Sequence, residues 1–161
     1  MLKIMIKYLI IILFVVFVPN FKAQSIITIS PGIKLGYAFG NEGGFVFGLE
    51  GSIMVDQNNH NPNRYRYGLV VSIETINDER RIHVGGQVNF SGGYSLFGVE
   101  VGPTFLIEES KRAVGLSITP YLGGFIIPYF RVNVFPQKDI QTEIGTFLKL
   151  HLPVQGQYSL G

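Results

Sequence analysis

The sequence predicts an all-β fold, a single eight-stranded up-and-down antiparallel transmembrane β-barrel, on three observations. First, apolar side chains alternate with small or polar ones along most of the 161-residue chain, which is the period of a β-strand. Second, short stretches of Gly, Asn, Asp and Pro separate the alternating runs, as in hairpin connections. Third, the chain is 47% apolar and only 15% charged, which is unusual for a soluble domain.

The N-terminal segment has the layout of a signal peptide. Lys3 and Lys7 precede an uncharged apolar run, Tyr8 to Val18, which is shorter than the roughly 20 residues that a membrane-spanning helix needs. We therefore predict that residues 1–23 are a signal peptide and that residues 24–161 form the barrel domain.

Charge and cysteine content exclude several kinds of function. Removal of Lys3, Lys7 and Lys22 leaves 10 of the 13 basic residues against 11 acidic ones, a net charge of about −1 for the mature chain. A polybasic surface is absent, so nucleic acid is not expected as a partner. Because the chain contains no cysteine, disulfides, Cys-ligated metals and Cys nucleophiles are impossible.

The alternation defines the strands in order, beginning with an unbroken run from Ile27 to Gly40. No helical spacing of apolar residues follows residue 24, so the strands should form one up-and-down sheet. Pro103 and Pro120 fall inside strands, and each should produce a bulge or a displaced pairing. The eight predicted strands span residues 27–40, 45–55, 65–75, 82–91, 97–107, 114–122, 130–134 and 144–152.

The two faces of these strands differ in a way that favours a membrane barrel. The apolar face carries no charge, whereas the other face is rich in Gly, Ser, Ala and Thr, which suit a crowded interior. Hydrocarbon tolerates such an outer face, and closure leaves no bare strand edge within it. Larger polar side chains of both signs are predicted to fill the lumen as a network: Lys34, Glu50, Arg66, Glu74, His83, Gln87, Glu100, Arg131, Lys149 and His151.

Turn positions suggest specific partners within that network. Symmetry of the first hairpin about Glu42 places Lys34 opposite Glu50, which predicts a buried ion pair. Symmetry of the second outward hairpin about the Asp78–Glu79 bond places Glu74 opposite His83. A register shift of two residues would keep the faces and change these partners.

Gly-rich alternating runs such as residues 31–37 and 101–105 resemble those of the eight-stranded outer-membrane barrels of the OmpA/OmpX type, over about residues 25–155. Residues 143–150 are similar to the assembly signal in the last strand of such barrels, although the last strand could end at Leu152 or include the tail. The resemblance implies an outer-membrane location, a monomer, and as partners outer-membrane lipid and the barrel-assembly machinery.

Periplasmic termini, as in those barrels, would make four connections face outward. These are residues 40–44, 77–80, 108–112 and 136–141.

No catalytic, cofactor-binding or metal-binding site is predicted. Some barrels of this kind are lipid A-modifying enzymes that use His with Ser and an acid, but His60, His83 and His151 form no such trio by spacing. The connection at 56–64 lacks the Gly and the closing Glu of a calcium loop. We expect a structural or interaction role in adhesion or the envelope. The alternatives are transport of a small solute and a soluble periplasmic lipocalin-like barrel that binds an apolar ligand.

Overall fold

A computed structural model describes residues 26–40, 43–56, 63–77, 79–92, 95–107, 112–136 and 138–155. The predicted signal peptide lies outside these ranges and stays a prediction. Within the described part, a helix with the length and hydropathy of a membrane span is absent. The strands of these ranges are β1 (Ile26–Phe39), β2 (Gly44–Asp56), β3 (Asn63–Ile76), β4 (Glu79–Gly92), β5 (Ser95–Ile107), β6 (Arg112–Leu122), β7 (Ile126–Val134), β8 (Gln141–Lys149) and β9 (Leu152–Gln155).

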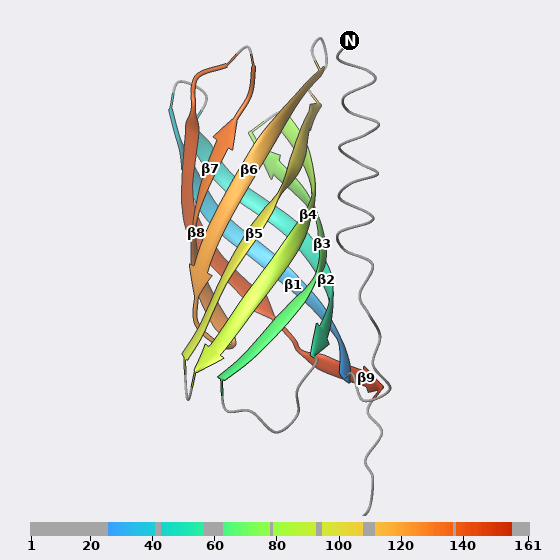
Figure 1. Cartoon of the computed structure of the whole chain (residues 1–161). Coiled ribbons are helices and arrows are strands. Elements are labelled where there is room, and N and C mark those ends of the chain that lie inside the picture. The colour runs from blue at the N-terminus through green and yellow to red at the C-terminus, as the bar shows by residue number, and fades with distance from the viewer. Residues whose placement is uncertain are drawn as a thin grey trace, which may run out of the picture.

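The strands close into a barrel, as Figure 1 shows. Each of β2 to β7 pairs antiparallel with both of its neighbours in sequence, β8 pairs with β7, and β1 pairs with both β2 and β8. The short β9 continues the line of β8 along β1. The predicted eight-stranded up-and-down antiparallel barrel is therefore confirmed, with β9 as an addition.

The barrel has two distinct ends. The final residues of β1, β3, β5 and β7 lie at one end, here called the mouth end, and β9 lies at the opposite end, the base end (Figure 1). The whole connection between β2 and β3, residues 57–62, lies outside the described residues.

The last two wall strands begin earlier than predicted, and the final strand is interrupted. β7 starts at Ile126 rather than at residue 130, and β8 starts at Gln141 rather than at residue 144. The interruption at residues 150–151 faces Pro31, whose carbonyl accepts a bond from the Leu150 N–H (3.0 Å). Because proline has no N–H to return, the ladder breaks here. Pairing then resumes in the same register at Leu152 and Pro153 and shifts by one residue at Gln155, so residues 152–155 join the wall as β9.

Pro103 and Pro120 interrupt pairing without shifting it. On one side of Pro103 and of Pro120 the ladder skips two residue pairs and resumes in the same register, so the predicted bulge or displaced pairing is wrong and a gap stands in its place. On the other side each proline remains paired, because a missing N–H affects only the strand toward which it would point. The pairs flanking the gaps are His83–Thr104 and Gly86–Val101 at Pro103, and Ile118–Val132 and Tyr121–Tyr129 at Pro120.

Both predicted hairpin registers are wrong by two residues. In the first hairpin Lys34 pairs with Gly48, and the predicted Lys34–Glu50 contact does not form. Gly40, with φ of 124°, turns the chain just after β1, and its carbonyl accepts a bond from the Gly43 N–H (3.0 Å). This close turn lies earlier in the chain than a turn centred on Glu42.

The second outward hairpin closes through a two-residue connection. Ile76 pairs with Glu79, and Asn77 adopts a φ of 51°, a left-handed conformation that Asn tolerates. As a result Glu74 pairs with Arg81, and His83 pairs with Ser72. The side-chain faces are unchanged, because a two-residue shift preserves them.

Candidate functional site

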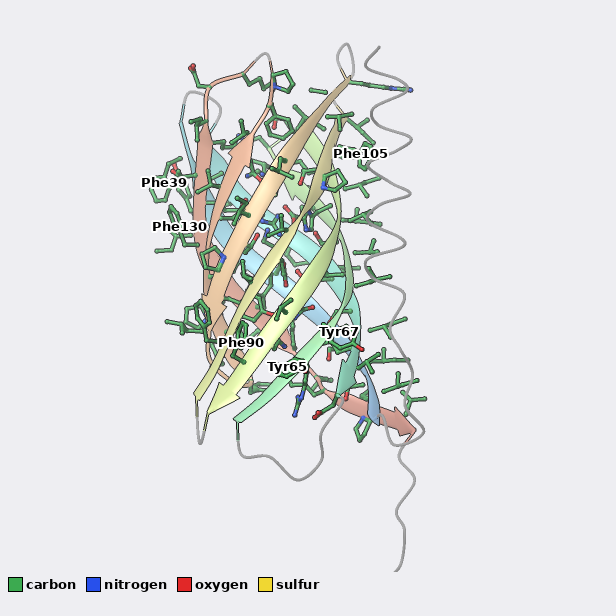
Figure 2. The ribbon with its side chains drawn as sticks, viewed as in Figure 1. Phe39, Tyr65, Tyr67, Phe90, Phe105 and Phe130 are labelled. Carbon is green, nitrogen blue, oxygen red and sulfur yellow. The ribbon has the colours of Figure 1, made fainter. Side chains whose placement is uncertain are left out.

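The wall of the barrel separates apolar from charged side chains. Exposed large apolar residues lie all around its outer face, and Figure 2 shows Phe39 and Phe105 toward the mouth end and Tyr65 and Phe90 toward the base end. The outward positions of β2 are exposed, whereas its inward positions are buried in strict alternation up to Met54. The lumen therefore holds the charged groups.

A carboxylate on β3 is the centre of the first lumen cluster. Glu74 Oε1 accepts bonds from Lys34 Nζ (2.9 Å) and Arg131 Nη1 (2.6 Å), and Arg81 Nη2 lies 3.3 Å from Oε2. The four side chains come from β1, β3, β4 and β7 and are fully buried. Ser72 Oγ also donates to Glu74 (2.7 Å).

A second carboxylate of this cluster comes from the last wall strand. Glu143 lies 2.7 Å from Lys34 Nζ and 2.7 Å from Arg81 Nη2. The hydroxyl of Tyr129 donates to the same carboxylate (2.5 Å). Glu143 therefore joins β8 to β1 and β4 across the lumen.

Lys149 is the centre of the second cluster. Its Nζ donates to Glu100 Oε1 (3.1 Å) and forms an ion pair with Glu50. Arg131 Nη2 lies 3.9 Å from Glu100 Oε2, which connects this cluster to the first. Glu50 thus pairs with Lys149, not with the predicted Lys34.

An aromatic layer lies between the ammonium groups of the two clusters. Phe147 stacks on Tyr129 with ring centroids 4.4 Å apart and meets Tyr121 edge-on at 6.0 Å. Lys149 Nζ lies 4.4 Å from the Phe147 ring, and Lys34 Nζ lies 4.7 Å from the Tyr129 ring. These cation–π contacts stabilise buried ammonium groups in addition to their ion pairs.

The lumen clusters balance in charge. They contain four cations, Lys34, Arg81, Arg131 and Lys149, and four carboxylates, Glu50, Glu74, Glu100 and Glu143. A buried charge is costly unless it is paired, so this balance is what allows the lumen to be filled with ionised side chains.

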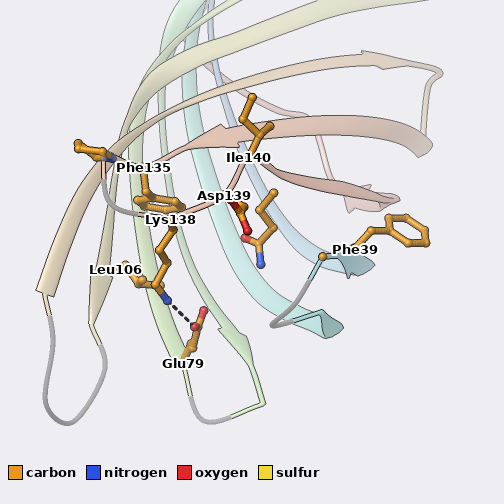
Figure 3. Close-up of a pocket in the computed structure, with 10 residues that line it drawn as sticks. Phe39, Glu79, Leu106, Phe135, Lys138, Asp139 and Ile140 are labelled. Carbon is orange, nitrogen blue, oxygen red and sulfur yellow. Dashed lines mark hydrogen bonds and ion pairs between the residues drawn. The ribbon is translucent and has the colours of Figure 1, made fainter.

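A cavity of about 420 Å³ opens at the mouth end (Figure 3), and its lining residue Gln141 accepts a bond from Arg81 of the first cluster (3.1 Å). Leu106 and Phe135 contribute apolar surface, and Lys138 Nζ donates to Glu79 Oε1 (3.0 Å) at its wall. The connection between β7 and β8 supplies much of the lining, including Asp139 and Ile140. Within the described ranges, no three His, Asp or Glu side chains gather as a metal site.

The wall geometry is similar to that of a solved bacterial structure. The fold resembles Neisserial surface protein A (NspA). The TM-score is 0.53 at 10% sequence identity, and the match covers 77% of this chain and 96% of the NspA chain. At this identity the likeness concerns the fold alone. No protein-family model matches the chain, and no curated protein matches it.

Eight of the ten residues predicted for the lumen network are buried inside the barrel. They are Lys34, Glu50, Glu74, His83, Gln87, Glu100, Arg131 and Lys149. The other two, Arg66 and His151, lie toward the base end and are less buried. Arg66 Nε donates to Asp56 Oδ2 (3.2 Å).

Two of the three histidines, His83 and His151, lie within the described residues, and each contacts a hydroxyl group; His60 lies outside them. His83 Nδ1 lies 3.0 Å from Thr104 Oγ1, within a chain of hydroxyl and amide groups. His151 Nδ1 lies 2.7 Å from Ser30 Oγ, but Ser30 is fully buried and so is closed to a substrate. A nucleophilic serine must be reachable and needs a third group to orient its histidine.

Sequence reasoning missed Arg81 and Glu143, which are central to the first cluster. Both lie just before the predicted starts of their strands, at residues 82 and 144. Arg81 has the same parity as His83, and Glu143 has the same parity as Gly145. Extending each alternation by one residue would have placed both in the lumen.

Proposed function

We propose that this chain is a small outer-membrane β-barrel of the OmpA/OmpX type, with its lumen plugged by its own side chains. Its role is structural or interactional, in adhesion or in the envelope. The observation that carries the proposal is the inverted distribution of side chains, with large apolar groups outside and paired charges inside. A soluble domain places its charges outside and its apolar side chains inside.

The bilayer explains both halves of this distribution. In hydrocarbon the exposed apolar face needs no cover, and closure of the barrel leaves no open strand edge. Among the described outward positions on the wall strands, charged side chains occur only at Arg80 and Arg112. Arg80 is the second residue of β4 and Arg112 is the first residue of β6, both at the mouth end. Headgroups and water at a membrane interface accommodate such arginines.

The proposed export, assembly and location of the chain follow from its resemblance to OmpA/OmpX-type barrels. The predicted signal peptide directs export, the segment at residues 143–150 is read by the barrel-assembly machinery, and the barrel resides as a monomer among outer-membrane lipids. The mouth end faces outward, so its connections and its cavity form the contact surface for a partner. The likeness of the fold to NspA, a surface protein, supports an outer-membrane location.

Neither alternative function fits the lumen as well. A solute channel needs open space along the barrel, and the burial of the side chains of both charge clusters and of the aromatic layer argues against such a channel. A lipocalin-like ligand site would need an apolar interior, and here the largest buried side chains include Arg81, Arg131, Lys34 and Lys149.

Cell fractionation and conductance test the proposal together. The chain expressed in a diderm host should sediment with outer membranes and resist osmotic shock. Purified protein in a planar bilayer should show no steady ion conductance. Release into the periplasm would support a soluble barrel, and a stable open-channel current would support transport.

A further inference from the structure

The outer face of the barrel has a narrow apolar furrow at the seam between β6 and β7. Its volume is about 270 Å³, and none of its exposed lining is polar. The furrow is formed at its sides and floor by Phe97, Pro120, Leu122, Pro128, Phe130 and Ile144.

The furrow exists because the seam is poorly paired. Four residue pairs join β6 to β7 among the described residues, compared with eleven between β5 and β6. The gap falls at Pro120, which cannot donate a backbone hydrogen bond toward β7. Proline rings project less far than Leu or Phe, so Pro120 and Pro128 form a low strip along the wall.

Two ridges border that strip. Phe97 pairs with Leu122 on one side, and Phe130 pairs with Ile144 on the other. All four side chains are between 45% and 56% exposed. The ridges keep a flat protein surface from reaching the floor, whereas a thin flexible chain can enter.

The chemistry of the furrow selects a hydrocarbon. Tyr121 and Tyr129 lie behind it, but their hydroxyls are engaged inside the barrel with Asn89 and Glu143. The furrow therefore offers neither charge nor hydrogen bond to a headgroup or a peptide. It is continuous with the apolar outer face, which contacts acyl chains if the wall lies in a bilayer.

We propose that this furrow is a binding site for one acyl chain of a membrane lipid. The inference rests on the proposed function, because only a membrane-embedded wall meets lipid tails. A preformed apolar groove binds an acyl tail more tightly than a smooth wall does. The groove covers more of the tail's apolar surface, while the tail loses about the same conformational freedom in both cases.

The absence of tryptophan from the chain permits a clean test. Phe97→Trp places a fluorophore on the rim of the furrow, and Phe47→Trp places one on β2, away from the seam. Both positions are exposed phenylalanines, so the two variants are matched. The full chain, purified in micelles of a short-chain detergent, is titrated with a phospholipid carrying dibrominated acyl chains, which quench tryptophan on contact.

If the furrow binds a lipid tail about tenfold more tightly than detergent, the binding free energies differ by about 1.4 kcal/mol. The initial quenching of Phe97→Trp should then be about tenfold steeper than that of Phe47→Trp. The rim signal should also saturate, while Phe47→Trp follows the mole fraction of brominated lipid linearly. Adding Pro120→Leu, which fills the floor, should reduce quenching at Phe97→Trp to the control slope.

The outcomes separate the two proposals. Equal linear quenching at both positions, in protein whose migration on a gel still changes on boiling, overturns the furrow site and leaves the membrane barrel intact. Protein that stays soluble without detergent and is quenched at neither position overturns the proposed function itself. If Pro120→Leu does not fold, the comparison of Phe97→Trp with Phe47→Trp still decides.

Discussion

Glu74 contacts three cationic side chains from three different strands, so this single residue ties β1, β4 and β7 to β3 through the lumen. Its burial makes those contacts mutually dependent. A carboxylate or an ammonium group left without a partner in the lumen is still removed from water but no longer forms an ion pair, so its burial destabilises the folded state. The energetics of the lumen are therefore those of a network and not of separate pairs.

The Lys34–Glu74 pair should show strong coupling. Glu74→Gln leaves its cations with a neutral amide, and we expect a loss of about 3–5 kcal/mol in the free energy of unfolding. The double variant Lys34→Met with Glu74→Gln restores the charge balance and should cost less than Glu74→Gln alone. Urea unfolding in lipid vesicles measures each value.

The same set of single and double variants at Lys34 and Glu50 is the matched control. They form no ion pair with each other, because Glu50 pairs with Lys149. Coupling between Lys34 and Glu50 should therefore be smaller than coupling between Lys34 and Glu74. The reverse order would restore the hairpin register predicted from the turn and contradict the observed one.

A charge on the outer face should be costly for a different reason. Leu49 is 61% exposed in the middle of β2, so in water Leu49→Arg would change stability little. In hydrocarbon near the midplane the same change should destabilise by about 2–4 kcal/mol. Leu49→Ala separates loss of the leucine from gain of the charge. Equal unfolding free energies for Leu49→Arg and Leu49→Ala in vesicles would place this face in water.

At the scale of strands and hairpins, the limits of sequence reasoning have identifiable causes. Alternation predicts strand identity and face, because both depend only on parity. Register depends on where a turn closes, and Gly40 and Asn77 close their turns at places that composition does not reveal. The lumen partners followed the register, so the predicted residues were largely inside while the predicted pairs were wrong.

Glycine provides a test of strand packing with an internal control. A Cβ at Gly68, on the inner face of β3, would lie 1.9 Å from the Ile53 carbonyl oxygen, whereas a Cβ at Gly51 meets nothing within 4 Å. Gly68→Ala should therefore destabilise by about 1–3 kcal/mol, because the backbones of β2 and β3 must separate. Gly51→Ala should be neutral or stabilising by less than about 1 kcal/mol. Thermal or urea unfolding that ranks the two variants the other way would contradict the pairing of β2 with β3.

At the scale of the whole molecule, the two ends of the barrel should face different compartments. Lys138 belongs to the β7–β8 connection at the mouth end, and Val154 lies on β9 at the base end. Because the chain has no cysteine, Lys138→Cys and Val154→Cys can be labelled singly. A membrane-impermeant maleimide should label Lys138→Cys in intact cells and Val154→Cys only after permeabilisation. Labelling of Val154→Cys alone in intact cells would invert the proposed orientation.

Gel migration after reconstitution tests whether this chain is a closed barrel embedded in a lipid bilayer. The protein is folded into lipid vesicles, floated on a density gradient, and divided into boiled and unboiled samples. A bilayer barrel floats with the lipid, and its unboiled form migrates as a compact band that shifts to the unfolded position on boiling. Protein that remains in the aqueous fraction, folded without detergent or lipid, would contradict the account.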